Sequence, residues 1–196
     1  KLTVRESQVA VFINEGELAD VFPPGMYTLE TSNLPILSTL KGWKYGFNSP
    51  FKAEVYFLST RLFKNMKWGT PNVFYIRDQD FGRVTLRAFG TYTFKISDAA
   101  KFIKEVSGTD GDFTADEVTG ELRSLIITRF IDSIGESKLS LLDFASNYKD
   151  LSDFCEKKLM EEFVDYGLEI KKFLISSISL PEELQKKLDE GTGMNM

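Results

Sequence analysis

The sequence contains no histidine and a single cysteine, Cys155. Without histidine the chain cannot form a Ser-His-Asp triad, a Cys-His pair or a histidine-ligated metal site. One cysteine excludes an internal disulfide and any zinc site that needs several thiolates within these residues. Sparse cysteine also fits a reducing compartment such as the cytosol. The chain therefore cannot form the commonest catalytic and metal-binding arrangements, and we expect no cofactor.

An excess of positive charge is missing as well. The chain has 24 Lys and Arg against 29 Asp and Glu, so its net charge is −5 at pH 7. Nucleic-acid-binding domains need a basic face for the phosphate backbone, so we expect no nucleic-acid partner. A local group of Lys41, Lys44 and Lys52 is interpreted as solvated surface. No uninterrupted apolar stretch approaches the ~20 residues of a membrane-spanning helix.

What is present suffices for a folded protein. Hydrophobic residues make up 42% of the chain and charged residues 27%, and 17 residues are Phe. A chain of this length buries roughly 70% of the surface that it exposes when unfolded. Phenylalanine rings bury large areas, which suggests a core between a sheet and helices, or apolar contact surfaces. We expect one domain or two small subdomains.

The first half of the chain predicts β structure. Residues 8–14, QVAVFIN, and residues 17–22, ELADVF, flank a turn and predict a hairpin. Further strands are expected in KAEVYFLST and NVFYIRD. In RVTLRAFGTYTFKI, Gly90 predicts a bulge or a close backbone approach. The residues expected on one face of that strand are Val84, Leu86, Ala88, Gly90, Tyr92, Phe94 and Ile96.

The second half predicts helices. Ser97 or Asp98 can cap a helix that runs through Val106, and Thr114 with Glu117 forms a capping box. The helix after this box is expected to end near Gly135. Its apolar residues recur at steps of three and four: Val118, Leu122, Leu125, Ile126, Phe130 and Ile134.

A short helix at SLLDFA and a third long helix follow. The third helix is predicted to carry one apolar stripe, and Gly167 suits its C-terminal cap. The stripe consists of Leu151, Phe154, Leu159 and Phe163.

A late strand is predicted over residues 168–180, between two helical segments. Leu168, Ile170, Leu174, Ile178 and Leu180 are expected on one face, with Phe173 and Ile175 on the other. Pro181, Glu182 and Glu183 then begin another helix. Such a strand must pair with strands formed much earlier, so it ties the helical half to the β half.

The order of these motifs resembles the SPFH (band 7) domain of the stomatin, prohibitin and flotillin superfamily. The segments concerned are FPPGMYTLET, RAFGTYTFKISD and YGLEIKKFLISSISLPEEL, and the likeness covers nearly the whole chain. It is nearest to bacterial SPFH proteins named virion core protein-like, which lack an obvious transmembrane segment and commonly carry a C-terminal zinc ribbon. No ribbon lies within these residues. Because the chain begins with Lys1, we expect it to be part of a longer product.

The resemblance implies an α+β fold in three parts. Residues 1–96 would form a β-rich subdomain, residues 97–180 an α/β subdomain, and residues 181–196 the start of a coiled-coil helix. It also implies a non-enzymatic scaffold that assembles into homo-oligomers and organises membrane patches, with a link to membrane-stress proteins. Its expected place is cytoplasmic, peripheral at the inner face of the cell membrane.

An apolar, aromatic loop is the candidate membrane or partner surface. Tyr and Trp suit a membrane interface, and Lys41 and Lys44 suit anionic headgroups. The alternative is a loop folded over the sheet as part of the core. The candidate residues are Leu34, Ile36, Leu37, Leu40, Trp43, Tyr45 and Phe47.

The last helix offers a candidate oligomer contact. Leu180, Leu184 and Leu188 form an apolar edge beside four-residue Glu-to-Lys pairs. This pattern favours the start of a coiled coil. The alternative is a solvated terminal helix.

No catalytic or metal residue is predicted. Asp78 and Asp80 are two apart, but DQDFG is interpreted as a turn without catalytic partners. Asp110, Asp112 and Asp116 do not meet a calcium-loop register. Cys155 is expected to be a buried thiol. The functional hypotheses are thus a membrane scaffold, a soluble adaptor that binds another protein, and, remotely, a hydrolase.

Overall fold

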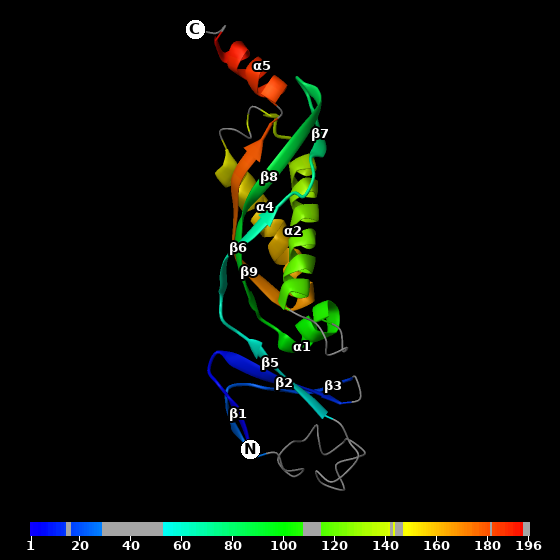
Figure 1. Cartoon of the computed structure of the whole chain (residues 1–196), viewed down its shortest axis with the longest axis vertical. Coiled ribbons are helices and arrows are strands. Elements are labelled where there is room, and N and C mark those ends of the chain that lie inside the picture. The colour runs from blue at the N-terminus through cyan, green and yellow to red at the C-terminus, as the bar shows by residue number, and fades with distance from the viewer. Residues whose placement is uncertain are drawn as a thin grey trace. The chain divides into compact units, whose positions relative to one another are not determined.

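The computed structural model describes residues 1–14, 17–28, 53–107, 115–141, 143, 147–180 and 182–193 (Figure 1). The fold is α+β, as predicted. The chain divides into two compact units. Unit 1 comprises Lys1–Phe63, Phe94–Val118 and Glu162–Glu169, and unit 2 comprises Lys64–Thr93, Thr119–Glu161 and Ile170–Met196. Strands β8 (Gly82–Ile96) and β9 (Leu168–Ser179) contribute residues to both units.

Unit 1 contains two small antiparallel sheets. Strand β1 (Leu2–Val4) pairs with β4 (Gly25–Tyr27), and β2 (Gln8–Asn14) lies between β3 (Glu17–Phe22) and β5 (Ala53–Ser59). The predicted β2–β3 hairpin is confirmed. Strand β2 does not alternate between buried and exposed residues, because four consecutive residues, 10 to 13, are all buried. Both faces of β2 are therefore covered.

Two chain segments meet at the helical part of unit 1. Helix α1 (Ala99–Phe102) begins where predicted, with the Asp98 carboxylate accepting the Lys101 N–H at 3.1 Å, and continues as the π-helix η3 (Ile103–Ser107). The 3₁₀ helix η4 (Val164–Tyr166) ends at Gly167, which has φ 71°. The Gly167 carbonyl accepts the N–H groups of Ser97 and Asp98 at 2.9 and 3.0 Å. The predicted left-handed cap is confirmed, and it also fixes the start of α1.

The sheet of unit 2 is built on β8. Strands β6 (Phe63–Gly69), β7 (Phe74–Asp78) and β9 all pair with β8. The alternation predicted for β8 is confirmed, since its even-numbered residues from Val84 to Ile96 are buried. The sequence did not predict β6, in which only Trp68 is fully buried.

Two helices cover the inward face of this sheet (Figure 1). The Phe130 ring of α2 (Ala115–Ser137) lies 4.8 Å from the Trp68 ring and 5.9 Å from that of Phe74. Ser152 of α4 (Tyr148–Phe163) accepts the Ile175 N–H of β9 at 3.1 Å. The predicted α2 stripe packs inward, its fully buried members being Leu122, Ile126, Phe130 and Ile134.

Helix α2 ends at Ser137, two residues beyond Gly135, near which its end was predicted, and the next residue, Lys138, has φ 53°. One detail of α4 corrects the sequence prediction. In α4, Phe154 is 37% exposed, whereas Cys155 is completely buried. The buried stripe follows strict four-residue steps, Leu151, Cys155, Leu159 and Phe163, and Phe154 falls beside it.

Strand β9 pairs with β8 as predicted, but its face assignment was wrong. Leu168 and Ile170 are buried, and the next buried residues are Phe173 and Ile175. Lys171 and Lys172 are both exposed, so the strand contains one extra residue between its buried positions. As a result Leu174, which was predicted to share the face of Leu168 and Ile170, is exposed. At Gly90 a Cβ atom would lie 1.9 Å from the Leu174 carbonyl oxygen. The predicted close backbone approach is thus confirmed.

Helix α5 (Glu182–Gly193) follows β9 directly, as predicted (Figure 1). Among the helices that the structure describes, none combines the length and the apolar character needed to cross a bilayer.

Candidate functional site

The two surfaces predicted from the sequence remain predictions. The whole apolar loop, Leu34, Ile36, Leu37, Leu40, Trp43, Tyr45 and Phe47, lies outside the described residues, as do Lys41, Lys44, Lys52, Asp110 and Asp112. Leu184 and Leu188 belong to α5, but the description of the structure does not extend to their side chains. Leu180, between β9 and α5, is half-buried.

Asp78 is a structural residue and not one of a catalytic pair. Its side chain is 5% exposed, and its Oδ2 accepts the N–H groups of Asp80 and Phe81 at 2.9 and 3.1 Å. Its Oδ1 accepts the Leu141 N–H at 2.8 Å. Burial raises the pKa of the Asp78 carboxyl, but the three backbone donors outweigh it and leave the pKa below its usual value. The exposed Asp80 lies in the predicted turn. The Asp78 carboxylate therefore stays ionised and holds the turn.

The only cysteine is also structural. Cys155 is completely buried, and burial raises the pKa of its thiol to about 11, while the side chain of Ser133 opposes the rise. A thiol with such a pKa is a poor nucleophile at neutral pH. The prediction of a buried thiol is confirmed. Within the described ranges, no group of three or more His, Cys, Asp or Glu side chains could hold a metal ion.

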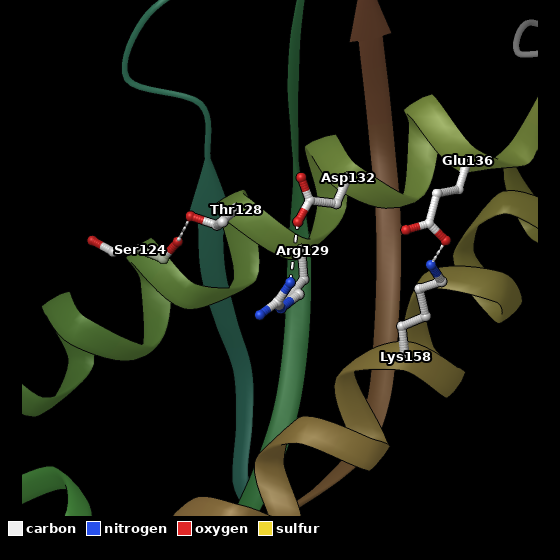
Figure 2. Close-up of polar contacts among 6 residues, drawn as sticks. All are labelled: Ser124, Thr128, Arg129, Asp132, Glu136 and Lys158. Carbon is white, nitrogen blue, oxygen red and sulfur yellow. Dashed lines mark hydrogen bonds and ion pairs between the residues drawn. The ribbon is translucent and has the colours of Figure 1, made fainter.

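A groove of about 560 Å³ lies between β7, with its following turn, and the C-terminal part of α2. Its acidic side chains are already engaged, as Figure 2 shows. Arg129 contacts Asp132 at 3.1 Å, and Lys158 of α4 pairs with Glu136. The lining residues are Tyr75, Ile76, Arg77, Gln79, Ile131, Asp132, Ile134, Gly135, Glu136, Lys138 and Leu139.

The outward face of the unit 2 sheet carries basic and apolar side chains together, which the sequence analysis missed. The odd-numbered residues of β8 point away from the helices, and those of β7 lie opposite them in register. Strand β6 adds Lys67 on the same side. We call this surface the cationic face and define it by Lys67, Tyr75, Arg77, Arg83, Arg87 and Phe89.

Two comparisons with known proteins concern the whole chain. The family model described as SPFH domain-Band 7 family matches residues 1–196. A Bacillus subtilis (strain 168) protein named "Uncharacterized protein YdjI" is 29% identical over 198 residues, which cover 100% of this chain and 61% of that protein. The chain thus spans about three fifths of the length of this curated relative.

Proposed function

The chain belongs to the SPFH domain–Band 7 family, and on that premise we propose that it is a non-enzymatic scaffold domain that self-associates and binds peripherally to membranes. The observation that carries the proposal is the family match, which extends over residues 1–196. Members of this family are generally non-catalytic scaffolds and are often associated with membranes.

The exit of the chain from the fold supports the self-association. Strand β9 ends at Ser179 and α5 begins at Glu182, so only two residues separate the sheet from the outgoing helix. So short a connection places the start of α5 beside the end of β9. In an assembly, many weak contacts per protomer add through multivalency, and each protomer needs only a small contact surface. The proposed partners are copies of the protein, lipid and membrane-stress proteins at the inner face of the cell membrane.

The test uses the longer protein that carries this chain. It is floated through a density gradient with vesicles that contain anionic lipid, and its size is measured by sedimentation velocity. We expect particles much larger than one protomer that rise with the vesicles. A protein that stays at the bottom of the gradient at low salt and sediments as a monomer would contradict the proposal.

The groove beside β7 favours a second candidate, a soluble adaptor that binds another protein. Among the described strands, β7 pairs with β8 alone, so its other edge is open to an added peptide strand. A protein partner bound there would be recovered equally with and without detergent, and Lys138→Glu in the groove lining would reduce recovery. The hydrolase hypothesis gains nothing from the structure, because the Asp78 carboxylate is held by backbone donors.

A further inference from the structure

The described strands of unit 2 separate charge strongly. Lys67 of β6, Arg77 of β7, and Arg83 and Arg87 of β8 are all exposed. The only acidic residues in the described strands β6, β7, β8 and β9 are Asp78, which is buried, and Glu169, which pairs with Lys95 in unit 1. The chain as a whole has a net charge of −5. One face of this sheet nevertheless carries cationic side chains, and the strands contribute no carboxylate to it.

The register places these cations on one side of the sheet. Tyr75 and Arg77 lie opposite Thr85 and Arg83, and Arg87 is two residues further along β8. In β6, a Cβ atom at Gly69 would lie 3.5 Å from the Phe89 Cβ, so Lys67 shares the face of Phe89.

The cations are not neutralised within the described part of the chain. None of the four takes part in an ion pair between described residues. Arg77 and Arg83 even lie directly opposite each other, and like charges in that position destabilise a sheet. The Arg83 guanidinium lies over the Tyr75 ring, 3.9 Å from its centre. An anionic partner would remove the repulsion between the two arginines.

Apolar side chains lie among these cations. Tyr75 is 57% exposed and Phe89 is 54% exposed. Aromatic side chains beside Lys and Arg are typical of surfaces that sit at the headgroup level of a bilayer. Two such side chains are few for a standard protein interface of about 800 Å² per partner. Peripheral attachment to anionic lipid, in contrast, needs only a handful of basic residues.

We propose that the cationic face is a docking surface for the anionic headgroups of a lipid bilayer. The inference rests on the proposed function and deepens it, because it assigns the membrane contact to named residues of the unit 2 sheet. Arg77, Arg83, Arg87 and Lys67 contact lipid phosphates, and Tyr75 and Phe89 enter the interface between them.

The experiment is co-sedimentation of the chain with vesicles of phosphatidylglycerol and phosphatidylcholine in equal parts. The double variant Arg83→Glu/Arg87→Glu is compared with Lys149→Glu/Lys157→Glu, which reverses two exposed lysines of α4 and changes the net charge equally. We expect the first variant to lose at least about tenfold in vesicle partitioning and the control to stay within about twofold, because basic residues act on a membrane only at short range. Wild-type binding should fall as salt rises from about 0.1 M to about 1 M.

Each other outcome is informative. Wild-type binding that Arg83→Glu/Arg87→Glu leaves unchanged would overturn the inference and leave the proposed function standing. Equal losses in the test and control variants would mean that net charge alone decides, which also overturns it. If Arg83→Glu/Arg87→Glu abolishes self-association but not vesicle binding, the face is an interface between copies.

If the wild-type chain does not bind anionic vesicles, that result contradicts the membrane part of the proposed function itself. Thermal unfolding monitored by circular dichroism checks that each variant folds. The milder pair Arg83→Gln/Arg87→Gln keeps the test available if charge reversal unfolds unit 2, and it should give an intermediate loss of partitioning.

Discussion

At the residue scale, Asp78 fastens the β7–β8 turn to the segment after α2. We predict that Asp78→Asn lowers the free energy of unfolding by about 1–3 kcal/mol at pH 7, because the amide NH₂ group then faces a backbone N–H donor. The measurement is urea unfolding. Asp80→Asn is the matched control two residues away, since the Asp80 side chain is exposed, and it should change stability by less than about 0.5 kcal/mol.

The same residue predicts a pH dependence. The pKa of Asp78 is lower in the folded chain than its usual value of 3.8. Its contribution is therefore fully present above that value and is lost as the pH falls through the lower, folded-state pKa. The stability difference between wild type and Asp78→Asn should shrink between about pH 5 and pH 2. A difference that grows on acidification would contradict this assignment.

Cys155 gives a second prediction at this scale. Burial and a thiol pKa of about 11 leave little thiolate at pH 8 in the folded chain. Relative to the urea-unfolded chain, we expect its reaction with a thiol-specific reagent to be slower by about 100-fold or more. The rates are compared by absorbance of the released chromophore. Equal rates in the two states would place the thiol at the surface.

At the scale of elements, β8 and β9 depend on the missing side chain of Gly90. A Cβ atom there would lie 1.9 Å from the Leu174 carbonyl oxygen and 2.8 Å from the Trp68 Nε1 atom. We predict that Gly90→Ala lowers the free energy of unfolding by roughly 2–4 kcal/mol, because one strand backbone must move. Urea unfolding measures the loss.

Gly120 in α2 is the control, because a Cβ atom there meets no atom within 4 Å. Gly120→Ala should raise the free energy of unfolding by up to about 1 kcal/mol, since Ala is the better helix former. Similar losses for both glycines would show that the β8–β9 approach is looser than described.

The elements also show where sequence patterns suffice. Strand β8 was predictable because its residues alternate between buried and more exposed positions without interruption from Val84 to Ile96. Strand β6 was not, since Lys64 and Lys67 occupy both faces of a strand with a single fully buried residue. In β9, one extra residue between Ile170 and Phe173 reverses the faces, and no periodicity marks its place. The buried stripe of α4 contains Cys155 and not Phe154. The position of a residue around the helix, and not its hydrophobicity, decides whether its side chain is buried there.

At the scale of the whole molecule, the units are not consecutive lengths of chain. Each takes residues from three separate segments, and β8 and β9 pass from one unit into the other. The cationic face could not be predicted for the same reason. Lys67, Arg77 and Arg83 come from three strands, and which strands are neighbours becomes known only from the pairing. In contrast, the apolar loop and the α5 leucines could each be proposed as candidate surfaces from one continuous segment of the sequence.

The last prediction concerns assembly. In the longer protein, we expect Leu184→Ser/Leu188→Ser to weaken self-association by about tenfold or more, because each buried leucine contributes roughly 1.5–3 kcal/mol. Vesicle binding by single protomers should persist. Sedimentation velocity over a concentration series gives the association constant, with the exposed Lys186→Ala on the same helix as control. Unchanged assembly would mean that α5 is a solvated helix.

Trp68 has a practical consequence. Its indole is 2% exposed, stacks on Phe173 at 5.2 Å and donates its N–H to the Leu174 carbonyl at 3.2 Å. The chain has only one other tryptophan, Trp43. A Trp43→Phe chain therefore carries a single fluorophore, whose emission shifts to longer wavelength when water reaches it. The emission of Trp68 would report the unfolding of unit 2 alone, in solution or on a vesicle, without any attached dye.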